Sequence, residues 1–411
     1  MTLLSDRDAL RSGQAPARRA VSLCFLLNGT VLASWLPHIP ELKSRLALDD
    51  GALGLLLLAM AAGAIVALPL AGWLVARLGS RTVTSASAAA LSAAVVLPVL
   101  TPGVATSAAA LALLGACNAT LDVAMNAHGV LVEDGYRRPI MSSFHALFSL
   151  GGLIGAGGAA VAMAMGLSAE THVIAVSLLA LATVCVAARR LLPTPPIQTP
   201  AGPVFAAPSA ALLGLGLLTF CALLAEGAVG DWSAVYLRDS LGTTASIAAM
   251  GFAAFSLAMA VGRFAGDRLA RRMGPTRLLR LSATLATGGL ALSLLAGQPV
   301  ISLLGFATVG LGVANLIPVL FSAAGRTHGV PAGTAIAAVA TTGYFGFLAG
   351  PPLIGFVADA AGLPTALGIV CGACTIVAGG AAIIPPPRSG PAPPEHVVTG
   401  AFTTNTEGSH G

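Results

Sequence analysis

Twelve apolar runs of about 20 residues leave this chain few ways to fold. An α-helix needs a run of that length to cross a hydrocarbon core of about 30 Å. The sequence therefore predicts an all-α integral membrane protein with twelve transmembrane helices. The predicted spans lie near residues 20–40, 51–75, 83–101, 104–128, 143–166 and 172–188, and near 209–230, 246–266, 278–296, 300–324, 335–358 and 364–384.

The charged residues agree with this fold and indicate an orientation. Only 9% of the 411 residues are charged, compared with about 25% in a typical soluble protein. The cations are 20 arginines and a single lysine, Lys43. If both termini are cytoplasmic, 17 arginines face the cytoplasm, whereas Lys43, Arg45 and Arg238 face outward. The positive-inside rule thus predicts a multi-pass protein of the cell membrane, inner or plasma, with both termini cytoplasmic.

Short matches at a separation near 200 residues predict an internal repeat. GGLIG at 151–155 matches PPLIG at 351–355, and LGACN at 114–118 matches LGVAN at 311–315. In the same order, RLGSR at 77–81 matches RMGPT at 272–276. We therefore expect two parallel six-helix bundles. The predicted organisation is a cytoplasmic tail at 1–19, bundles at 20–190 and 209–384, a proline-rich cytoplasmic linker at 191–208 and a disordered cytoplasmic tail at 385–411.

One apolar run carries three polar side chains on a single helical face. Asn118, Asp122 and Asn126 are spaced i, i+4 and i+8, so 3.6 residues per turn align them. A carboxylate at the membrane centre costs about 2.5–3.5 kcal/mol, and it normally faces a protein interior or a water-filled path. Because burial disfavours the charged form, Asp122 is a candidate proton carrier. The alternative is a structural carboxylate that pairs with a neighbouring helix.

The predicted repeat separates the members of this polar face. It pairs Asn118 with Asn315, whereas Asp122 and Asn126 have apolar counterparts. A purely architectural group is expected in both halves. The functional prediction therefore rests on Asp122, with Asn126 beside it.

The segment GWLVARLGSR at 72–81 resembles the G-x-x-x-D-R-x-G-R-[RK] signature of the Major Facilitator Superfamily, with Ala76 where the family usually has aspartate. That superfamily has two parallel six-helix halves with a substrate site between them at mid-membrane. The missing aspartate removes the usual acidic latch of the signature. The segment GRFAGDR at 262–268 occupies the equivalent place after the eighth run. The resemblance implies conformational gating by Gly72, Arg77, Gly79, Arg81, Asp267 and Arg268.

Three further stretches resemble the fucose-permease-like, or YbjJ-like, branch of the superfamily. They are LDVAMNAHG at 121–129, SSFHALFSLGG at 142–152 and AEGAVGDW at 225–232. In fucose permeases a carboxylate of the fourth helix is implicated in sugar binding and proton coupling, so the resemblance also points to Asp122. It implies a secondary active transporter that takes up a small polar solute, such as a sugar, by proton symport.

Two other functions are compatible with the same fold. A proton-coupled antiporter that exports drugs or metabolites is the first alternative, although the fifth run lacks the Gly-Pro motif usual in such antiporters. A non-transporting sensor or assembly protein is the second alternative.

Two ionisable residues in other runs are candidates for the substrate or proton site. Glu226 is a second membrane carboxylate, and its alternative is a helix-end group anchored among the lipid headgroups. His145 is able to relay a proton, because histidine titrates near neutral pH. Its alternative is a hydrogen bond that ties the fourth and fifth helices together.

Uncharged polar and aromatic residues complete the candidate site. Asn28, Asn315 and Tyr344 are expected to line the cavity, where a polar substrate satisfies their hydrogen bonds. The alternative for each is a hydrogen bond between helices. Trp35 and Trp232 lie near the outer ends of their runs, so we interpret them as membrane-interface residues. The alternative for both, and for Tyr344, is stacking on a sugar ring.

The sequence lacks the motifs of several other chemistries. It contains no G-x-x-x-x-G-K-[ST] nucleotide loop, no H-E-x-x-H metal motif and no G-x-S-x-G nucleophile turn. The six cysteines all fall within apolar runs, where they act as small packing residues. We therefore expect no enzymatic activity, no cofactor, no metal and no nucleic acid. The expected partners of a monomeric protein are a small-molecule substrate, protons and membrane lipid.

Overall fold

The computed structural model describes residues 2–136, 140–194, 210–327, 330 and 332–384, and every regular element in these ranges is a helix. Twelve helices are long and apolar enough to cross a membrane. This number confirms the twelve predicted spans. The predicted tail at 385–411 and most of the predicted linker at 191–208 lie outside the described residues.

The first six spans form the N-terminal half. Its first helix begins at Thr2, so it includes residues 2–19 of the predicted tail, and it continues through a 3-10 turn into a short helix. The elements of this half are α1 (Thr2–Trp35), η1 (Leu36–His38), α2 (Ile39–Arg45), α3 (Asp50–Leu78), α4 (Ser80–Ala94), α5 (Leu97–Leu100), α6 (Val104–Tyr136), α7 (Met141–Ala164) and α8 (Ala169–Ala188).

The last six spans form the C-terminal half. Its tenth span is broken at Ala314 and Asn315, where one helix ends and the next begins. The elements are α9 (Ala210–Val235), η2 (Tyr236–Ser240), α10 (Ala245–Met273), α11 (Pro275–Ala296), α12 (Pro299–Val313), α13 (Leu316–Ala324), α14 (Ala332–Ala361), α15 (Leu363–Gly380) and η3 (Ala381–Ile383).

A shift of 195 residues relates the beginning and end of α3 to those of α10. The side chains of Asp49 and Thr244 each accept a hydrogen bond from the backbone N–H three residues later, which caps the helix that follows. Both helices end at a glycine with a φ of 78°, Gly79 and Gly274. Side chains disfavour this conformation, so glycine ends both helices.

The same shift relates close contacts between helices. A Cβ atom added to Gly115 on α6 would collide with the carbonyl oxygen of Met60 on α3. One added to Gly310 on α12 would collide with the carbonyl oxygen of Phe255 on α10. Helix backbones approach this closely only over small residues. The repeat is therefore present in the packing as well as in the sequence.

The packing corrects the predicted alignment of the repeat. With the shift of Gly115 to Gly310, Asn118 corresponds to Val313, and the predicted pairing of Asn118 with Asn315 is wrong. The pairing of 151–155 with 351–355 is also wrong, since Gly151 packs on α1 as Gly346 packs on α9. Glycine, alanine and leucine are so abundant in this sequence that short identical segments also occur several residues away from the true alignment of the two halves.

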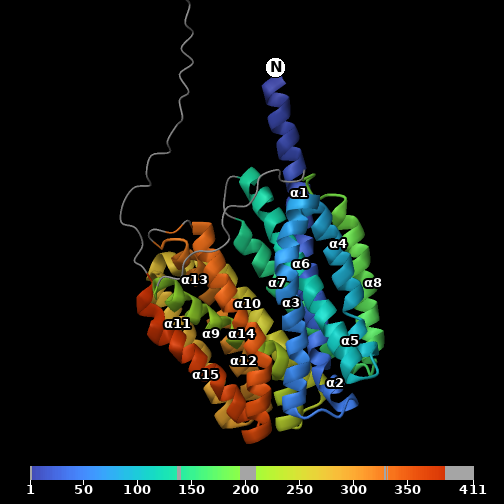
Figure 1. The fold of residues 1–411 in the computed structure, drawn as a ribbon, viewed down its shortest axis with the longest axis vertical. Coiled ribbons are helices and arrows are strands. Elements are labelled where there is room, and N and C mark those ends of the chain that lie inside the picture. Colours follow the sequence, from blue (N-terminus) through green and yellow to red (C-terminus); the bar gives the residue numbers. More distant parts are fainter. Residues whose placement is uncertain (1, 137–139, 195–209, 328–329, 331, 385–411) are drawn as a thin grey trace, which may run out of the picture.

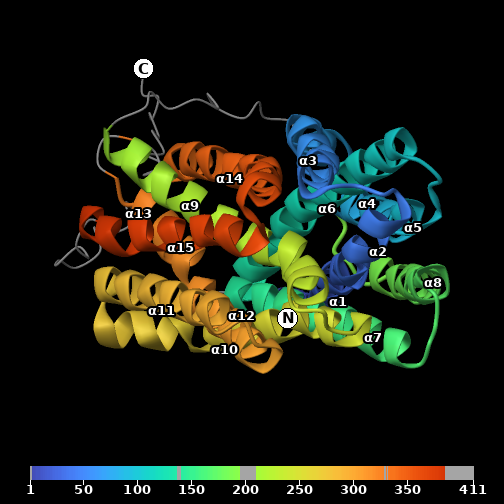
Figure 2. The ribbon, with the colours of Figure 1, turned by 90° about the horizontal axis from the view of Figure 1, so that it is seen from below.

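The two halves lie side by side, as Figures 1 and 2 show. They meet along two seams, α7 against α10 and α3 against α14. We call the end of the molecule at the start of α1 the terminal side, and the opposite end, which carries α2, the far side (Figure 1).

The halves are closed against each other on the far side. A Cβ atom on Gly54 of α3 would lie 2.5 Å from the carbonyl oxygen of Pro351 on α14. The Lys43 ammonium on α2 lies 2.7 Å from Asp50 and 2.8 Å from Asp239 on η2. The contact between Gly54 and Pro351 joins two backbones, and the ion pair between Lys43 and Asp239 joins two charges. Both of these contacts cross between the halves.

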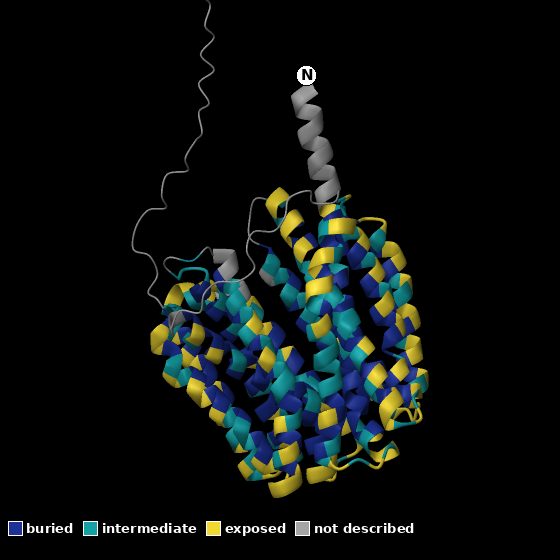
Figure 3. Cartoon of the chain, viewed as in Figure 1, coloured by how far each residue is buried: buried dark blue, intermediate teal, exposed yellow. Residues whose placement is uncertain are grey.

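The outer surface of the bundle exposes large apolar side chains. Examples are Val66, Leu179 and Leu295, which are 78%, 70% and 87% exposed. Figure 3 shows such exposed positions on the outward faces of the helices, with buried residues between the helices. A surface of this kind is suited to lipid, and polar residues are left for the interior.

Candidate functional site

Asp122 and Asn126 are in contact on α6, as predicted from their spacing. The Asn126 Nδ2 donates a hydrogen bond to Asp122 Oδ1 at 3.1 Å and another to the Asp122 carbonyl oxygen at 2.8 Å. Both side chains are half-buried. Asn118, one turn earlier, has an enclosed Oδ1 without a hydrogen-bond partner. This face of α6 therefore presents a carboxylate and an unused amide acceptor.

Asn28 on α1 faces the same part of α6. Its Nδ2 lies 3.9 Å from the sulfur of Met125, and its Oδ1 is enclosed without a partner. The residue is only 1% exposed. Buried polar atoms without partners are uncommon in folded proteins. The Asn28 amide oxygen is thus a second unused acceptor beside the polar face of α6.

The C-terminal half supplies an ion pair. Glu226 Oε1 on α9 lies 3.6 Å from Arg263 Nη2 on α10. Both residues are half-buried. Tyr344 on α14 is within electrostatic reach of both Asp122 and Glu226. Since Asp122 belongs to the other half, these residues form one polar region between the halves. Asp122 and Glu226 lie near the middle of their spans, whereas Arg263 lies near the terminal-side end of the span Ala245–Gly266.

Arg263 also reaches across to the N-terminal half. Its Nη1 donates a hydrogen bond to Ser149 Oγ at 2.6 Å and a longer one to the His145 carbonyl oxygen at 3.4 Å. The sequence alone places this arginine only within a predicted gating segment. An arginine inside an apolar run is itself a signal, because a cation in a membrane needs a partner or a function.

Two predicted site residues make structural contacts. The His145 ring packs edge-on against Phe25, with ring centroids 5.2 Å apart. Asn315 is buried, and its Nδ2 donates a hydrogen bond to the Gly262 carbonyl oxygen at 3.2 Å. The Asn315 contact is the interhelical hydrogen bond that was the alternative for this residue.

The prediction that Trp35 and Trp232 are membrane-interface residues is wrong, because both residues are 0% exposed. Their indole N–H groups have no hydrogen-bond partner. The physical reason lies in the fold. Their helices continue past the expected ends into η1, α2 and η2, and the closed far side covers both rings.

The predicted gating segment holds the turn between α3 and α4 to the end of α8. The Arg81 backbone N–H donates to Thr194 Oγ1 at 3.0 Å, and its Nη2 donates to the Ala188 carbonyl oxygen at 3.3 Å. A Cβ atom on Gly79 would collide with the Thr194 carbonyl oxygen. These contacts all lie within the N-terminal half, on the terminal side.

The other gating candidates lie near the same end of the bundle. Gly72 is exposed, and a Cβ atom there would meet nothing within 4 Å. The Arg77 guanidinium lies 5.2 Å from the centre of the Trp73 ring. Arg268 is exposed, and the side chain of Asp267 lies outside the described part of the chain. Their gating role stays a prediction.

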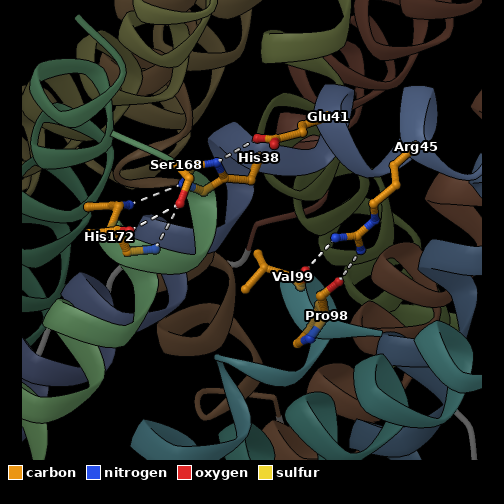
Figure 4. Close-up of polar contacts among 8 residues, drawn as sticks. His38, Glu41, Arg45, Pro98, Val99, Ser168 and His172 are labelled. Carbon is orange, nitrogen blue, oxygen red and sulfur yellow. Dashed lines mark hydrogen bonds and ion pairs between the residues drawn. The ribbon is translucent and has the colours of Figure 1, made fainter. Parts of the chain in front are cut away.

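Polar contacts on the far side tie the N-terminal half together, as Figure 4 shows. His38 Nε2 lies 3.1 Å from His172 Nδ1, and His38 Nδ1 lies 3.4 Å from Glu41 Oε2. The Arg45 guanidinium donates to the carbonyl oxygens of Pro98 and Val99. Among the described residues, no group of three or more His, Cys, Asp or Glu is placed to hold a metal ion.

Comparison with known proteins identifies the family. The family model described as Major Facilitator Superfamily matches residues 21–330 and 215–404. An uncharacterised MFS-type transporter of Yersinia pestis is 39% identical over 348 residues, which cover 85% of this chain and 90% of the relative. The membrane protein MosC of Rhizobium meliloti is 35% identical over 376 residues, which cover 90% and 91%.

Solved structures share the fold. The nucleoside transporter NupG has a TM-score of 0.70 at 13% identity, covering 90% of this chain and 100% of that one. The Escherichia coli fucose:proton symporter FucP has a TM-score of 0.58 at 20% identity, covering 90% and 99%. At these identities the likeness concerns the fold alone. Together with the family match and the twelve spans, it shows that this multi-pass membrane protein is a transporter of the Major Facilitator Superfamily.

Proposed function

We propose that this transporter couples the uptake of a small polar solute, such as a sugar, to the entry of protons. The observation that carries the proposal is the environment of Asp122. This half-buried carboxylate receives its hydrogen bond from a neutral amide, and in the described part of the chain it has no ion-pair partner. A desolvated carboxylate without a counter-charge is well suited to bind and release a proton.

The neighbouring side chains support a polar solute. Asn28 and Asn118 each have an enclosed amide oxygen without a donor, and a solute with hydroxyl groups supplies such donors. Tyr344 adds a phenol from the opposite half. The fold relative FucP is a fucose:proton symporter, which supports a sugar as the first class to test.

Transport of this kind requires the two halves to rock around the central site. We place the terminal side in the cytoplasm of a cell whose inner or plasma membrane holds the protein, because the arginines cluster at that end. The contacts of Gly54 and Lys43 then close the path to the outside. A monomer is sufficient for this cycle, and the cycle requires no cofactor.

The first experiment identifies a solute. Ligands that bind only the folded state raise its apparent stability, so the purified protein is screened by thermal shift against sugars, sugar acids, amino acids and lipophilic cations. The best ligand is then used in proteoliposomes with a pH-sensitive dye inside.

The flux measurement tests both coupling and direction. In the wild type we expect a solute gradient to drive protons in the same direction, whereas an antiporter moves them in the opposite direction. Asp122→Asn should abolish the coupled proton flux. Asp134→Asn, an exposed acid on the same helix, is the matched control and should keep it. Full proton coupling in Asp122→Asn would contradict the proposal, and absence of any flux would favour a non-transporting protein.

A further inference from the structure

Five exposed arginines surround one turn of the C-terminal half, on the terminal side of the bundle. They lie at the end of α10 and the beginning of α11, before and after Gly274. None of them has an ion-pair partner among the side chains that the structure describes. We call this set the basic turn, and its members are Arg268, Arg271, Arg272, Arg277 and Arg280.

The basic turn borders directly on an exposed apolar surface. On α10, Phe264 comes one helical turn before Arg268 and is 65% exposed. On α11, Leu281 comes one helical turn after Arg277 and is 57% exposed. Residues four apart lie on the same face of a helix. Each helix therefore carries one outward face that is apolar along the span and cationic at its end.

The outward face of α10 points away from its neighbours in the bundle. Its Ser256 lies against Gly152 of α7, and its Gly262 lies against Ala314 after α12. At 3.6 residues per turn, these two contacts are turned by roughly 120° to either side of Arg268. Arg268 therefore faces the surroundings of the protein and not the space between the halves.

The corresponding turn of the N-terminal half differs in charge and in cover. A Cβ atom on Gly79 would collide with the Thr194 carbonyl oxygen, whereas nothing lies within 4 Å of a Cβ atom on Gly274. The shift of 195 residues pairs Arg272 with Arg77, and it pairs the other four arginines with Trp73, Ala76, Thr82 and Ser85. The excess of arginine is thus confined to the turn that is open.

We propose that the basic turn binds the phosphate groups of anionic phospholipids, whose acyl chains lie on the exposed side chains of Phe264 and Leu281. A guanidinium group pairs with phosphate through two parallel hydrogen bonds. Clusters of cations at a membrane surface attract anionic lipids. A soluble anion would contact the charges alone, whereas a phospholipid covers both the charges and the apolar surface beside them.

The experiment measures lipid binding to the full chain in detergent by native mass spectrometry. The probe is cardiolipin, whose headgroup carries two phosphates, and phosphatidylcholine is the comparison lipid without net charge. The test variants are Arg268→Gln/Arg271→Gln on α10 and Arg277→Gln/Arg280→Gln on α11. Each removes two cations of the basic turn. Thermal unfolding confirms that each variant is folded.

The matched control is Arg189→Gln/Arg190→Gln. These two arginines are also exposed and follow α8 in the other half of the molecule. The control therefore changes the net charge by the same amount as each test variant, at a different place on the surface.

We expect the wild type to bind cardiolipin at least tenfold more tightly than phosphatidylcholine. An arginine near anionic headgroups contributes about a factor of five in affinity. Each test variant should therefore bind cardiolipin about tenfold or more less tightly, and the control should keep the wild-type affinity. Cardiolipin with a photoreactive acyl chain should crosslink to peptides that contain Phe264 or Leu281.

Wild-type affinity in both test variants would overturn the proposal, as would an equal loss in the control. Displacement of cardiolipin by millimolar inorganic phosphate would show that a soluble anion suffices, and it would overturn the assignment to lipid. The assay uses no transported solute and no proton gradient. Its outcome is therefore independent of whether the proposed function is correct.

Discussion

Lys43 Nζ lies 2.8 Å from Asp239 Oδ2, and this ion pair joins α2 of one half to η2 of the other. The second partner of Lys43 is Asp50, which belongs to the same half as the lysine. Of the two ion pairs of Lys43, only the one with Asp239 has to break when the far side opens. The ammonium group keeps a carboxylate beside it in both arrangements.

The Asp239→Asn substitution should favour opening of the far side by a small factor. Partly exposed ion pairs contribute about 0.2–1 kcal/mol, which corresponds to a shift of about 1.5- to 5-fold in the equilibrium. Opening makes the amine of Lys43, the single lysine, more accessible. Its acylation by a water-soluble, amine-directed ester, followed by peptide mass spectrometry, should therefore be faster in Asp239→Asn at low salt. The difference from wild type should shrink in high salt, because ions screen exposed charges. Equal rates at low salt would show that the pair contributes nothing to closure.

The Asn126→Ala substitution should impair proton-coupled transport without changing the fold. It removes the amide that donates to Asp122 Oδ1 at 3.1 Å. Hydrogen bonds to charged groups contribute about 1.5–3 kcal/mol, so we expect about a tenfold or greater loss in the coupled initial rate. The rate is measured in proteoliposomes under a pH gradient.

The control for Asn126→Ala is Asn315→Ala, whose amide donates to the Gly262 carbonyl oxygen within the C-terminal half. That variant should lower thermal stability and leave the transport rate per folded molecule largely intact. If the two variants lose coupled transport equally, Asn126 has no special relation to Asp122.

Features set by local physics were predictable from the sequence. The twelve spans follow from the length of helix that a bilayer demands, and all twelve are present. The contact between Asp122 and Asn126 follows from their spacing of one helical turn. Neither inference needs knowledge of how the helices pack against one another.

Features that depend on packing between distant helices were not predictable. Trp35 and Trp232 are buried because the far side is closed, and nothing in their local sequence encodes that closure. Ser149 and Glu226 lie on other helices than Arg263, so only the packing of α7 and of α9 against α10 brings them together. The repeat was detectable, but its register came from the glycine contacts of the structure.

The Gly115→Ala substitution should destabilise the N-terminal half. The added methyl group would collide with the carbonyl oxygen of Met60 on α3, and overpacking typically costs about 1–3 kcal/mol. Gly288→Ala on α11 is the matched control, because nothing lies within 4 Å of its added Cβ atom. Thermal unfolding in detergent should give a lower Tm for Gly115→Ala only. A Tm equal to that of the control would mean that α3 and α6 are free to separate slightly.

The Glu133→Gln substitution should loosen the beginning of α7, the helix that carries Ser149. Glu133 Oε2 accepts hydrogen bonds from the backbone N–H groups of Ile140 at 2.5 Å and Met141 at 2.8 Å. The first N–H groups of a helix lack partners within it and favour negative charge nearby. Neutralising the carboxylate should cost about 0.5–2 kcal/mol.

Hydrogen–deuterium exchange checks this effect directly. The amides of Ile140 and Met141 should exchange faster in Glu133→Gln, whereas amides in the middle of α7 should keep their protection. Asp134→Asn changes the adjacent, exposed acid and should leave all of these amides unchanged. Identical exchange at Ile140 and Met141 in both variants would mean that the charge of Glu133 does not hold the start of α7.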